Sequence, residues 1–294
     1  MSPTTIPSDP AIVVSGRKPH DDEVDLFGVT HQGHVRKSNQ DHYLVTMLHK
    51  TMRVHSTSLP NPEILEIPSQ RLASGMMVAD GVGGSRAGGE ASRSALEAIA
   101  SYVTQTMQCY FASDSQRAVA FTTALQEAAD ACHESVLERG RRHPEFAGMA
   151  TTLTLSIVTW PKLYILHVGD SRCYMLRQDE LIQLTRDQTM AQYLVDTGAL
   201  PADRIKRSPF ANVLASAIGG TTQPEVGEHT MVEGDVLLLC SDGLTKHVSD
   251  EQIKAHLMAM ETSEQVSRAL IQDALDAGGS DNVTVVVGRA VLRA

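Results

Sequence analysis

Residues 236–243 read VLLLCSDG, so a run of apolar residues typical of a buried strand leads directly into Asp242 and Gly243. A carboxylate at the end of a buried strand is costly unless a turn uses it or a cation binds it. This feature constrains the fold most, because the chain must surround that strand end with either a tight turn or a positive charge.

The same pattern recurs along the chain. Strand-like apolar segments adjoin Asp80 in VADGVGG, Asp170 in HVGDSR, Asp242 in LCSDGL and Asp281 in GGSDNVTVVV. A single Asp-Gly pair is most often a turn, since Asp hydrogen-bonds its own backbone and Gly accepts a positive φ. Four acidic residues at strand ends predict instead that the carboxylates converge.

Converging carboxylates without a positive partner would repel one another and raise each other's pKa, whereas divalent cations would keep them ionised. Oxygen ligands favour Mg²⁺ or Mn²⁺ over zinc. Two such ions about 3.5–4 Å apart can deprotonate a bridging water and stabilise both oxygens of an in-line phosphoryl displacement. The acidic residues therefore predict hydrolysis of a phosphoester.

The phosphate of such a substrate needs a cationic partner. Arg36 stands five residues before Asp41 in the polar link HVRKSNQD, between two predicted strands. A guanidinium offers a two-pronged fork to phosphate oxygens, so Arg36 is the candidate phosphate-binding residue. Taken alone it would be an ordinary surface arginine, and the acidic residues favour the functional interpretation.

The order of strand-like and helix-like segments indicates an α+β fold. Residues 152–157 alternate between apolar and hydroxyl side chains, which predicts a half-buried strand. Two long helices are expected after the third strand, at residues 91–107 and 118–140, the second ending at Gly140. Two more are expected before the last strand, capped by Ser249 and Thr262. We therefore expect antiparallel sheets covered by helices.

Composition excludes several classes of function. The chain has 35 acidic and 25 basic residues, a net charge of −10, and no Lys/Arg cluster dense enough for a nucleic-acid backbone. Its four cysteines are far apart, which argues against a zinc knuckle or a disulfide framework. No signal-peptide pattern and no apolar run of membrane-spanning length occurs. We expect a cytoplasmic protein without nucleic-acid or membrane partners.

Residues 1–22 are rich in Pro, Ser and charge and predict a flexible leader, followed by one domain at residues 23–294. Within the domain, residues 187–220 combine a short helix near residues 190–196 with proline breaks and a basic patch of Arg204, Lys206 and Arg207. This segment is interpreted as a surface subdomain, here called the flap.

Seven motifs carry a family resemblance. In order along the chain they are RKSNQD, VADGVGG, MATT, HVGDSR, LTRDQT, LLLCSDGL and GGSDNVTVV. Their order and approximate spacing resemble those of the metal-dependent protein serine/threonine phosphatases of type 2C, and the match is similar to the bacterial branch. It spans about residues 24–287. Each motif is weak alone, whereas seven in order are highly specific.

The resemblance implies two packed antiparallel β-sheets flanked by pairs of α-helices, in four layers αββα. It also implies a centre of two Mn²⁺ or Mg²⁺ ions, with a possible third, between the ends of the sheets. Asp80 would bridge both metals, and the Gly81 carbonyl would bind the second. Asp242 and Asp281 would complete the first, and Asp170 together with Asp242 would hold the third.

Other site residues follow from the same resemblance. Arg36 matches the phosphate-binding arginine, and Asp41 matches the carboxylate that holds metal-bound water. Asn282 is a candidate for orienting the metal ligands without binding the metal itself. Gln40, which stands where many relatives have a glutamate, is a second such candidate. Val82 replaces a histidine proposed as general acid in animal enzymes, and Gln188 replaces the usual histidine of LTRDQT.

The implied activity is hydrolysis of phosphoserine and phosphothreonine in proteins by a metal-bridging water. Its partners would be phosphoprotein substrates, including a bacterial Ser/Thr kinase, and the chain would act as a monomer. Two alternatives stay open: a pseudophosphatase that only binds, and a hydrolase of small phosphoesters. The complete set of core acids argues against the first, and the long, partly basic flap favours a protein substrate over the second.

Overall fold

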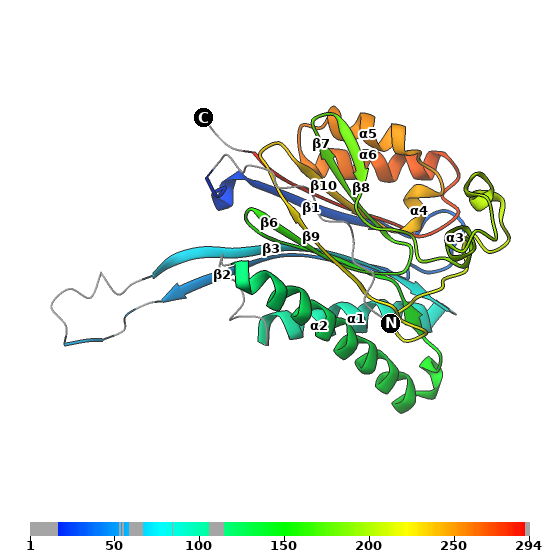
Figure 1. The fold of residues 1–294 in the computed structure, drawn as a ribbon, viewed down its shortest axis with the longest axis horizontal. Helices are drawn as coiled ribbons and strands as arrows, with labels where there is room; N and C mark the ends of the chain where they lie inside the picture. Colours follow the sequence, from blue (N-terminus) through cyan, green and yellow to red (C-terminus); the bar gives the residue numbers. More distant parts are fainter. Residues whose placement is uncertain are drawn as a thin grey trace.

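Two antiparallel β-sheets stack face to face, and helices cover the outer face of each (Figure 1). The computed structural model describes residues 17–52, 54, 56–58, 67–83, 85–105 and 115–291. Within these residues the layers follow the order helix, sheet, sheet, helix. The predicted α+β fold with four αββα layers is therefore confirmed.

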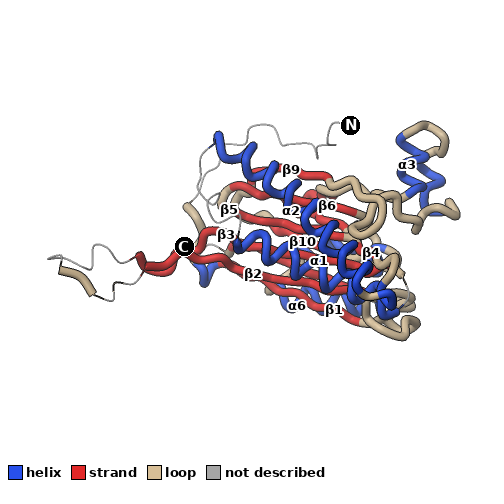
Figure 2. The backbone as a smooth tube through the Cα atoms, turned by 90° about the horizontal axis from the view of Figure 1, so that it is seen from below, coloured by secondary structure: helices blue, strands red, loops and turns tan. Residues whose placement is uncertain are grey.

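The first sheet has six strands and is covered by the two long helices that the sequence predicts after the third strand of the chain. Figure 2 shows α1 (Ser85–Gln105) and α2 (Ser115–Arg142) crossing this sheet, where Ile99 and Leu125 are fully buried. The strand order is β2 (Asp41–Met52), β3 (Ile67–Val82), β5 (Leu153–Thr159), β6 (Lys162–Val168) and β9 (Glu225–Thr230), and β4 (Ala150–Thr151) pairs with β3.

The second sheet has five strands and is covered by α5 (Asp250–Met258) and α6 (Ser263–Asp276). Ser249 accepts a hydrogen bond from the Gln252 amide and Thr262 one from the Gln265 amide, which confirms both predicted N-caps. The strand order is β1 (Val24–His31), β11 (Val283–Ala290), β10 (Val236–Cys240), β7 (Arg172–Arg177) and β8 (Glu180–Gln183).

Strand β5 is buried on both faces, so the prediction of a half-buried strand is wrong. Every residue from Leu153 to Ile157 is buried, because helices cover one face and the second sheet covers the other. The inward hydroxyl of Thr154 lies 3.0 Å from His167 Nδ1. The alternation of apolar and hydroxyl side chains distinguishes the two faces of this strand, but neither face is exposed to solvent.

The end of α2 also differs from the prediction. The helix continues to Arg142, so Gly140 lies inside its last turn and does not follow its C-terminus. A short 3₁₀ turn at Pro144–Phe146 comes directly after it. Because glycine is tolerated within a helix at a modest cost, its presence alone does not fix the end.

The predicted leader falls partly outside the described residues, which begin at Arg17. Residues 17–22 lie against β3, where the buried Arg71 guanidinium donates to the Pro19 carbonyl at 2.6 Å and to Asp21 Oδ1 at 3.0 Å. A 3₁₀ turn at Asp21–Glu23 then leads into β1. β2 and β3 extend together beyond the rest of their sheet (Figure 1).

The flap lies at one end of the sandwich, away from the sheets in Figure 2. It contains α3 (Met190–Asp196), as predicted, and a 3₁₀ segment at Ala202–Arg207 that carries the basic patch. Thr189 caps α3 by accepting from the Gln192 amide. In the described part of the chain, no helix is long and apolar enough to cross a bilayer.

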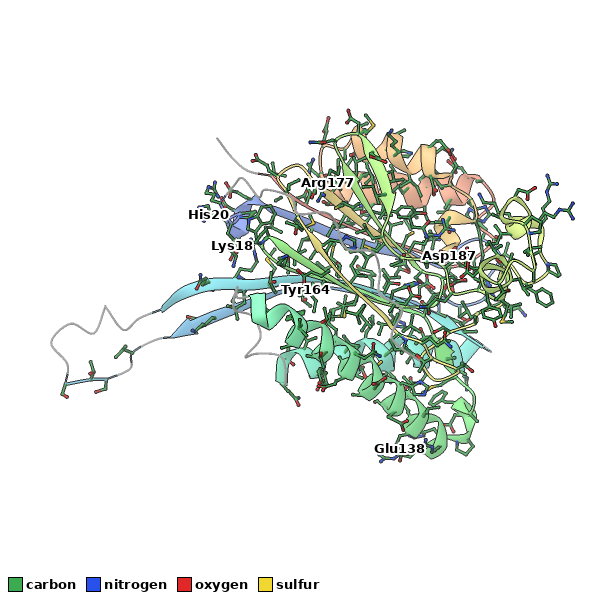
Figure 3. The ribbon with its side chains drawn as sticks, in the orientation of Figure 1. Lys18, His20, Glu138, Tyr164, Arg177 and Asp187 are labelled. Carbon is green, nitrogen blue, oxygen red and sulfur yellow. The ribbon has the colours of Figure 1, made fainter. Side chains whose placement is uncertain are left out.

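A buried ion pair joins the end of β7 to the start of β10, at the end of the second sheet away from the flap, where Arg177 is labelled in Figure 3. Arg177 donates to both carboxylate oxygens of Asp235, at 2.9 and 2.6 Å, and the Asp235 side chain is 1% exposed. We expect Arg177→Met to lower the free energy of unfolding by about 3–5 kcal/mol, because it leaves the buried Asp235 carboxylate without its cationic partner.

Urea unfolding of the metal-free protein measures this loss. The double variant Arg177→Met with Asp235→Asn is the matched control and should recover part of it, because it removes the stranded charge. A single-variant loss below about 1 kcal/mol would show that the pair is not needed for stability.

Candidate active site

Two acidic residues face each other at the ends of neighbouring strands. Asp41 opens β2 and Asp80 lies near the end of β3, and the antiparallel register places them directly opposite one another. Like charges in this relation destabilise a sheet. The pair therefore requires protons or a cation to balance it.

Asp41 is held by hydroxyl groups from the other sheet. Its Oδ2 accepts hydrogen bonds from Ser241 Oγ and from Thr284 Oγ1, both at 2.7 Å. Its Oδ1 is buried and has no hydrogen-bond donor. Burial raises the pKa of Asp41 to about 6, although the two hydroxyl donors lower it in part.

Asp80 is fixed through its backbone. Its amide donates to Thr152 Oγ1 at 2.9 Å, and its carbonyl accepts from Thr151 Oγ1 and the Thr152 amide. Burial raises the pKa of Asp80 well above its ordinary value, and the charges of Asp41 and Asp242 raise it further. The backbone thus directs this carboxyl group toward other acids.

Asp170 lies in the turn between β6 and β7 and is buried. Burial raises its pKa to about 8, with the charge of Asp242 as the next cause. Gln188 holds this turn, since its Oε1 accepts from the Gly169 amide at 2.9 Å and its Nε2 donates to the Gln223 carbonyl at 3.1 Å. The glutamine that departs from the family pattern therefore ties the turn to the segment that follows the flap.

Asp242 and Asp281 are paired with cations. Lys246 Nζ lies 2.5 Å from Asp242 Oδ2 and 2.7 Å from Asp281 Oδ2. The Arg36 guanidinium pairs with the Asp281 carboxylate at two points, Nε with Oδ1 at 2.6 Å and Nη2 with Oδ2 at 2.8 Å. Burial acts to raise the pKa of Asp281, but the hydrogen bonds from Arg36 and Lys246 lower it overall, whereas the pKa of Asp242 is raised by burial.

Gln40 and Asn282 join the N-terminal link to the start of β11. Asn282 Oδ1 accepts from the Gln40 amide at 2.9 Å, and its Nδ2 donates to the Gln32 and Ser38 carbonyls. The Gln40 carbonyl accepts from the Gly81 amide at 3.2 Å. Both residues thus hold backbone in place, and the Asn282 amide group is fully engaged.

Gly243 follows Asp242 because another chain segment passes close by. A Cβ at Gly243 would lie 1.9 Å from the Asn282 carbonyl oxygen, which leaves no room for a side chain. The same applies to Gly81, where a Cβ would meet the Gly88 carbonyl at 2.2 Å. These glycines permit a close approach of backbones beside the acids.

A cleft of about 880 Å³ opens above the acids. Asp80, Asp170, Asp242 and Asp281 line it together with Arg36, and residues 212–217 of the flap line the facing wall. Asp187, labelled in Figure 3, marks the end of the sandwich where the flap begins. The exposed Val82 also lines the cleft and carries no proton donor.

The chemistry of these donors fits a hard divalent cation. Asp41 Oδ1 and Asp242 Oδ1 are buried acceptors without a hydrogen-bond partner, and carboxylate oxygens are what Mg²⁺ and Mn²⁺ bind. Among the described residues, no group of three or more His, Cys, Asp or Glu is arranged to hold a metal as it stands. Asp242 and Asp281 instead hold Lys246.

Sequence reasoning missed three residues at this site. Lys246 carried a detectable signal, since it stands four residues after Asp242 and such pairs share a helix face. Ser241 and Thr284 carried none, because they are ordinary strand-end hydroxyls until the fold brings them to Asp41, which is 200 and 243 positions away.

A comparison with protein families identifies the chain. A model of protein phosphatase 2C matches residues 66–277, which is more than half of the sequence. The chain belongs to the protein phosphatase 2C family. The resemblance carried by the seven motifs is thereby confirmed.

Two bacterial proteins are similar to this 2C family member. It is 36% identical over 217 residues to the serine/threonine protein phosphatase PstP of Mycobacterium tuberculosis, covering 74% of this chain and 40% of that protein's length. It is 31% identical to the serine/threonine phosphatase stp of Listeria innocua, covering 72% of this chain and 82% of the relative.

A solved structure shares the fold. It is the catalytic domain of the phosphatase PstP in complex with two manganese ions, 30% identical to this chain. The match has a TM-score of 0.70 and covers 92% of this chain and 99% of that one.

The raised pKa of Asp170 has a consequence for stability without metal. A carboxyl group whose pKa rises on folding contributes stability that is fully present below its unfolded value and is lost as pH rises through the folded value, here about 8. In EDTA, the melting temperature of Asp170→Asn minus that of the unaltered protein should therefore grow from about pH 5 to about pH 9.

Thermal unfolding of both proteins across this pH range measures the difference. Distant groups that titrate in both proteins cancel in the subtraction, so the change reports on residue 170 and on the acids that its charge affects, Asp80 and Asp242. A difference that stays constant or shrinks with rising pH would contradict the buried, repelled state of this carboxyl group.

Proposed function

We propose that this chain is a metal-dependent phosphatase that removes phosphate from phosphoserine and phosphothreonine in proteins. The observation that carries the proposal is the gathering of carboxyl groups beside Arg36 in a cleft, with buried unpartnered oxygens on Asp242 at the cleft and on Asp41, which lies opposite Asp80. Membership of the protein phosphatase 2C family and the names of its bacterial relatives support the same reaction.

Mn²⁺ or Mg²⁺ is the proposed cofactor, two ions with a possible third, as the manganese complex of PstP suggests for two. Asp80, Asp242, Asp281 and the Gly81 carbonyl would hold the pair, and Asp170 with Asp242 the third. When bound, such ions supply a nucleophile at neutral pH and neutralise charge on the phosphate. Asp80 would be a ligand of the pair, because burial and the neighbouring acids both disfavour its charge in the absence of a cation and three hydrogen bonds fix its backbone.

Arg36 and Asp41 have distinct proposed roles. The Arg36 guanidinium is oriented by Asp281, which engages its Nε and one Nη2 hydrogen, at the wall of the cleft, where the remaining Nη1 and Nη2 hydrogens can donate to phosphate oxygens. Asp41 keeps Oδ1 as a buried acceptor while Ser241 and Thr284 fix Oδ2, so it can hold and orient a water. Val82 offers no proton, so we propose that solvent protonates the leaving group.

A phosphoprotein is the proposed substrate. The flap forms one wall of the cleft and carries Arg204, Lys206 and Arg207 on an adjoining segment, which supports contact with a chain larger than a small phosphoester. We propose that these substrates are products of a bacterial Ser/Thr kinase, that the kinase itself is among them, and that the enzyme acts as a monomer.

Release of phosphate from a phosphothreonine peptide in Mn²⁺ tests the proposal. We expect turnover by the unaltered protein and a loss of about 10³-fold or more in Asp80→Asn, because the amide removes a charge that the ions require. Asp179→Asn is the matched control, since Asp179 is exposed in the β7–β8 turn and should tolerate the change.

The outcomes separate the alternatives. A folded protein without Mn²⁺-dependent turnover of any phosphoester would favour a binding module. Turnover of p-nitrophenyl phosphate with none of phosphopeptides would favour a hydrolase of small phosphoesters.

Arg36→Ala tests phosphate binding separately. We expect kcat/KM to fall about 10²-fold, because the variant loses a charged donor aimed at the transferred group. Arg141→Ala on α2 removes a matched charge from an exposed pair with Glu138 and should change kcat/KM little. An equal effect of the two substitutions in steady-state kinetics would remove Arg36 from the site.

A further inference from the structure

Lys246 places a positive charge among the acids proposed to bind metal. Its Nζ lies 2.5 Å from Asp242 Oδ2 and 2.7 Å from Asp281 Oδ2, so one ammonium group joins two carboxylates from different parts of the chain. The lysine also lines the cleft. No role proposed above uses this residue.

The backbone holds Lys246 close to Asp242. α4 (Asp242–Thr245) is a single helical turn, and the Lys246 amide donates to the Asp242 carbonyl at 2.9 Å. Residues four apart lie on the same helix face, so the two side chains meet. Leu244 is fully buried and anchors the turn. The ammonium group is therefore held at the site by the chain itself, unlike a metal ion, which must bind from solution.

The tethered charge occupies oxygens that a metal would need. Asp281 has both oxygens engaged, Oδ1 by Arg36 and Oδ2 by both Arg36 and Lys246, and Asp242 Oδ2 is held by Lys246. Among the described residues that line the cleft, Arg36 and Lys246 are the basic ones, facing four aspartates. When all four aspartates are ionised, their charge exceeds that of the two basic residues, which favours a divalent ion over a single ammonium group.

We propose that Lys246 competes with the divalent metal for Asp242 and Asp281, so that the chain binds its metal more weakly than the same acids would without the lysine. This inference rests on the proposed metal-dependent function. In the absence of metal, Lys246 offsets the repulsion between the two carboxylates. Asp242 keeps a free Oδ1, but Asp281 has no free oxygen, so an ion that takes Asp281 Oδ2 must displace Lys246 from it, because one carboxylate oxygen cannot be fully shared between an ammonium group and a small, hard cation.

The competition makes the site responsive to the supply of metal. At low metal concentration the lysine keeps Asp242 and Asp281 neutralised, and the site stays intact without a cofactor. At higher concentration the stronger field of the divalent ion prevails. Lys246 thus sets the concentration at which the protein becomes loaded.

Isothermal titration of the metal-free protein with Mn²⁺, checked by the electron paramagnetic resonance signal of free Mn²⁺, tests this inference without measuring activity. We expect Lys246→Gln to tighten the strongest Mn²⁺ site about tenfold, the order of a partly buried ion pair. Lys162→Gln is the matched control, because Lys162 pairs with Glu228 at 2.6 Å and does not line the cleft. It should change the affinity less than about twofold.

Melting temperatures give a second measurement. Lys246→Gln should melt lower than the unaltered protein in EDTA, because Asp242 and Asp281 then repel, and Mn²⁺ should raise its melting temperature by more. Lys246→Arg keeps the positive charge and should not tighten Mn²⁺ binding. Comparing it with Lys246→Gln separates the effect of the lost charge from any effect of the substitution on folding.

Each outcome bears on one proposal or on both. Equal or weaker Mn²⁺ binding by Lys246→Gln, with the unaltered protein binding normally, would overturn the role of Lys246 and leave the proposed function standing. Binding by the glutamine variant alone would support the competition in its strongest form. Absence of Mn²⁺ binding in both proteins would overturn the inference and the metal-dependent function together.

Discussion

Repulsion between buried carboxyl groups is the constraint on which the rest of the site depends. Asp41 and Asp80 face each other across two strands, and Asp170 and Asp242 raise the charge nearby. A fold that concentrates negative charge in this way is stable only with protons or cations at the same place. The raised pKa values of these acids and the engagement of Lys246 are two responses to that one constraint.

The sandwich holds this charge in place through strand register and through packing away from the site. Strand register fixes Asp80 opposite Asp41, and β11 and β10 bring hydroxyl donors to Asp41 from the second sheet. Apolar packing between the sheets stabilises the strands. This packing offsets the destabilisation that the buried acids cause at the site. The flap then adds a wall to the cleft.

Sequence patterns predicted the parts of this arrangement that depend on local chemistry. The helix caps at Ser249 and Thr262 and the helix at Met190–Asp196 follow from short-range rules, and the structure has them. The burial of β5 and the end of α2 beyond Gly140 did not follow. Burial depends on what covers a strand, and a helix end depends on tertiary contacts as well as on its own residues.

By itself the sequence determined the residue types, the strand ends on which the acids stand, and the motif order that marks the family. Only the tertiary structure decided which groups interact with these acids. It placed Ser241 and Thr284 on Asp41, and it joined Arg36 and Lys246 to Asp281. The physical reason is range: a motif specifies neighbours along the chain, whereas charge and hydrogen bonding act between groups that only folding brings within about 3 Å.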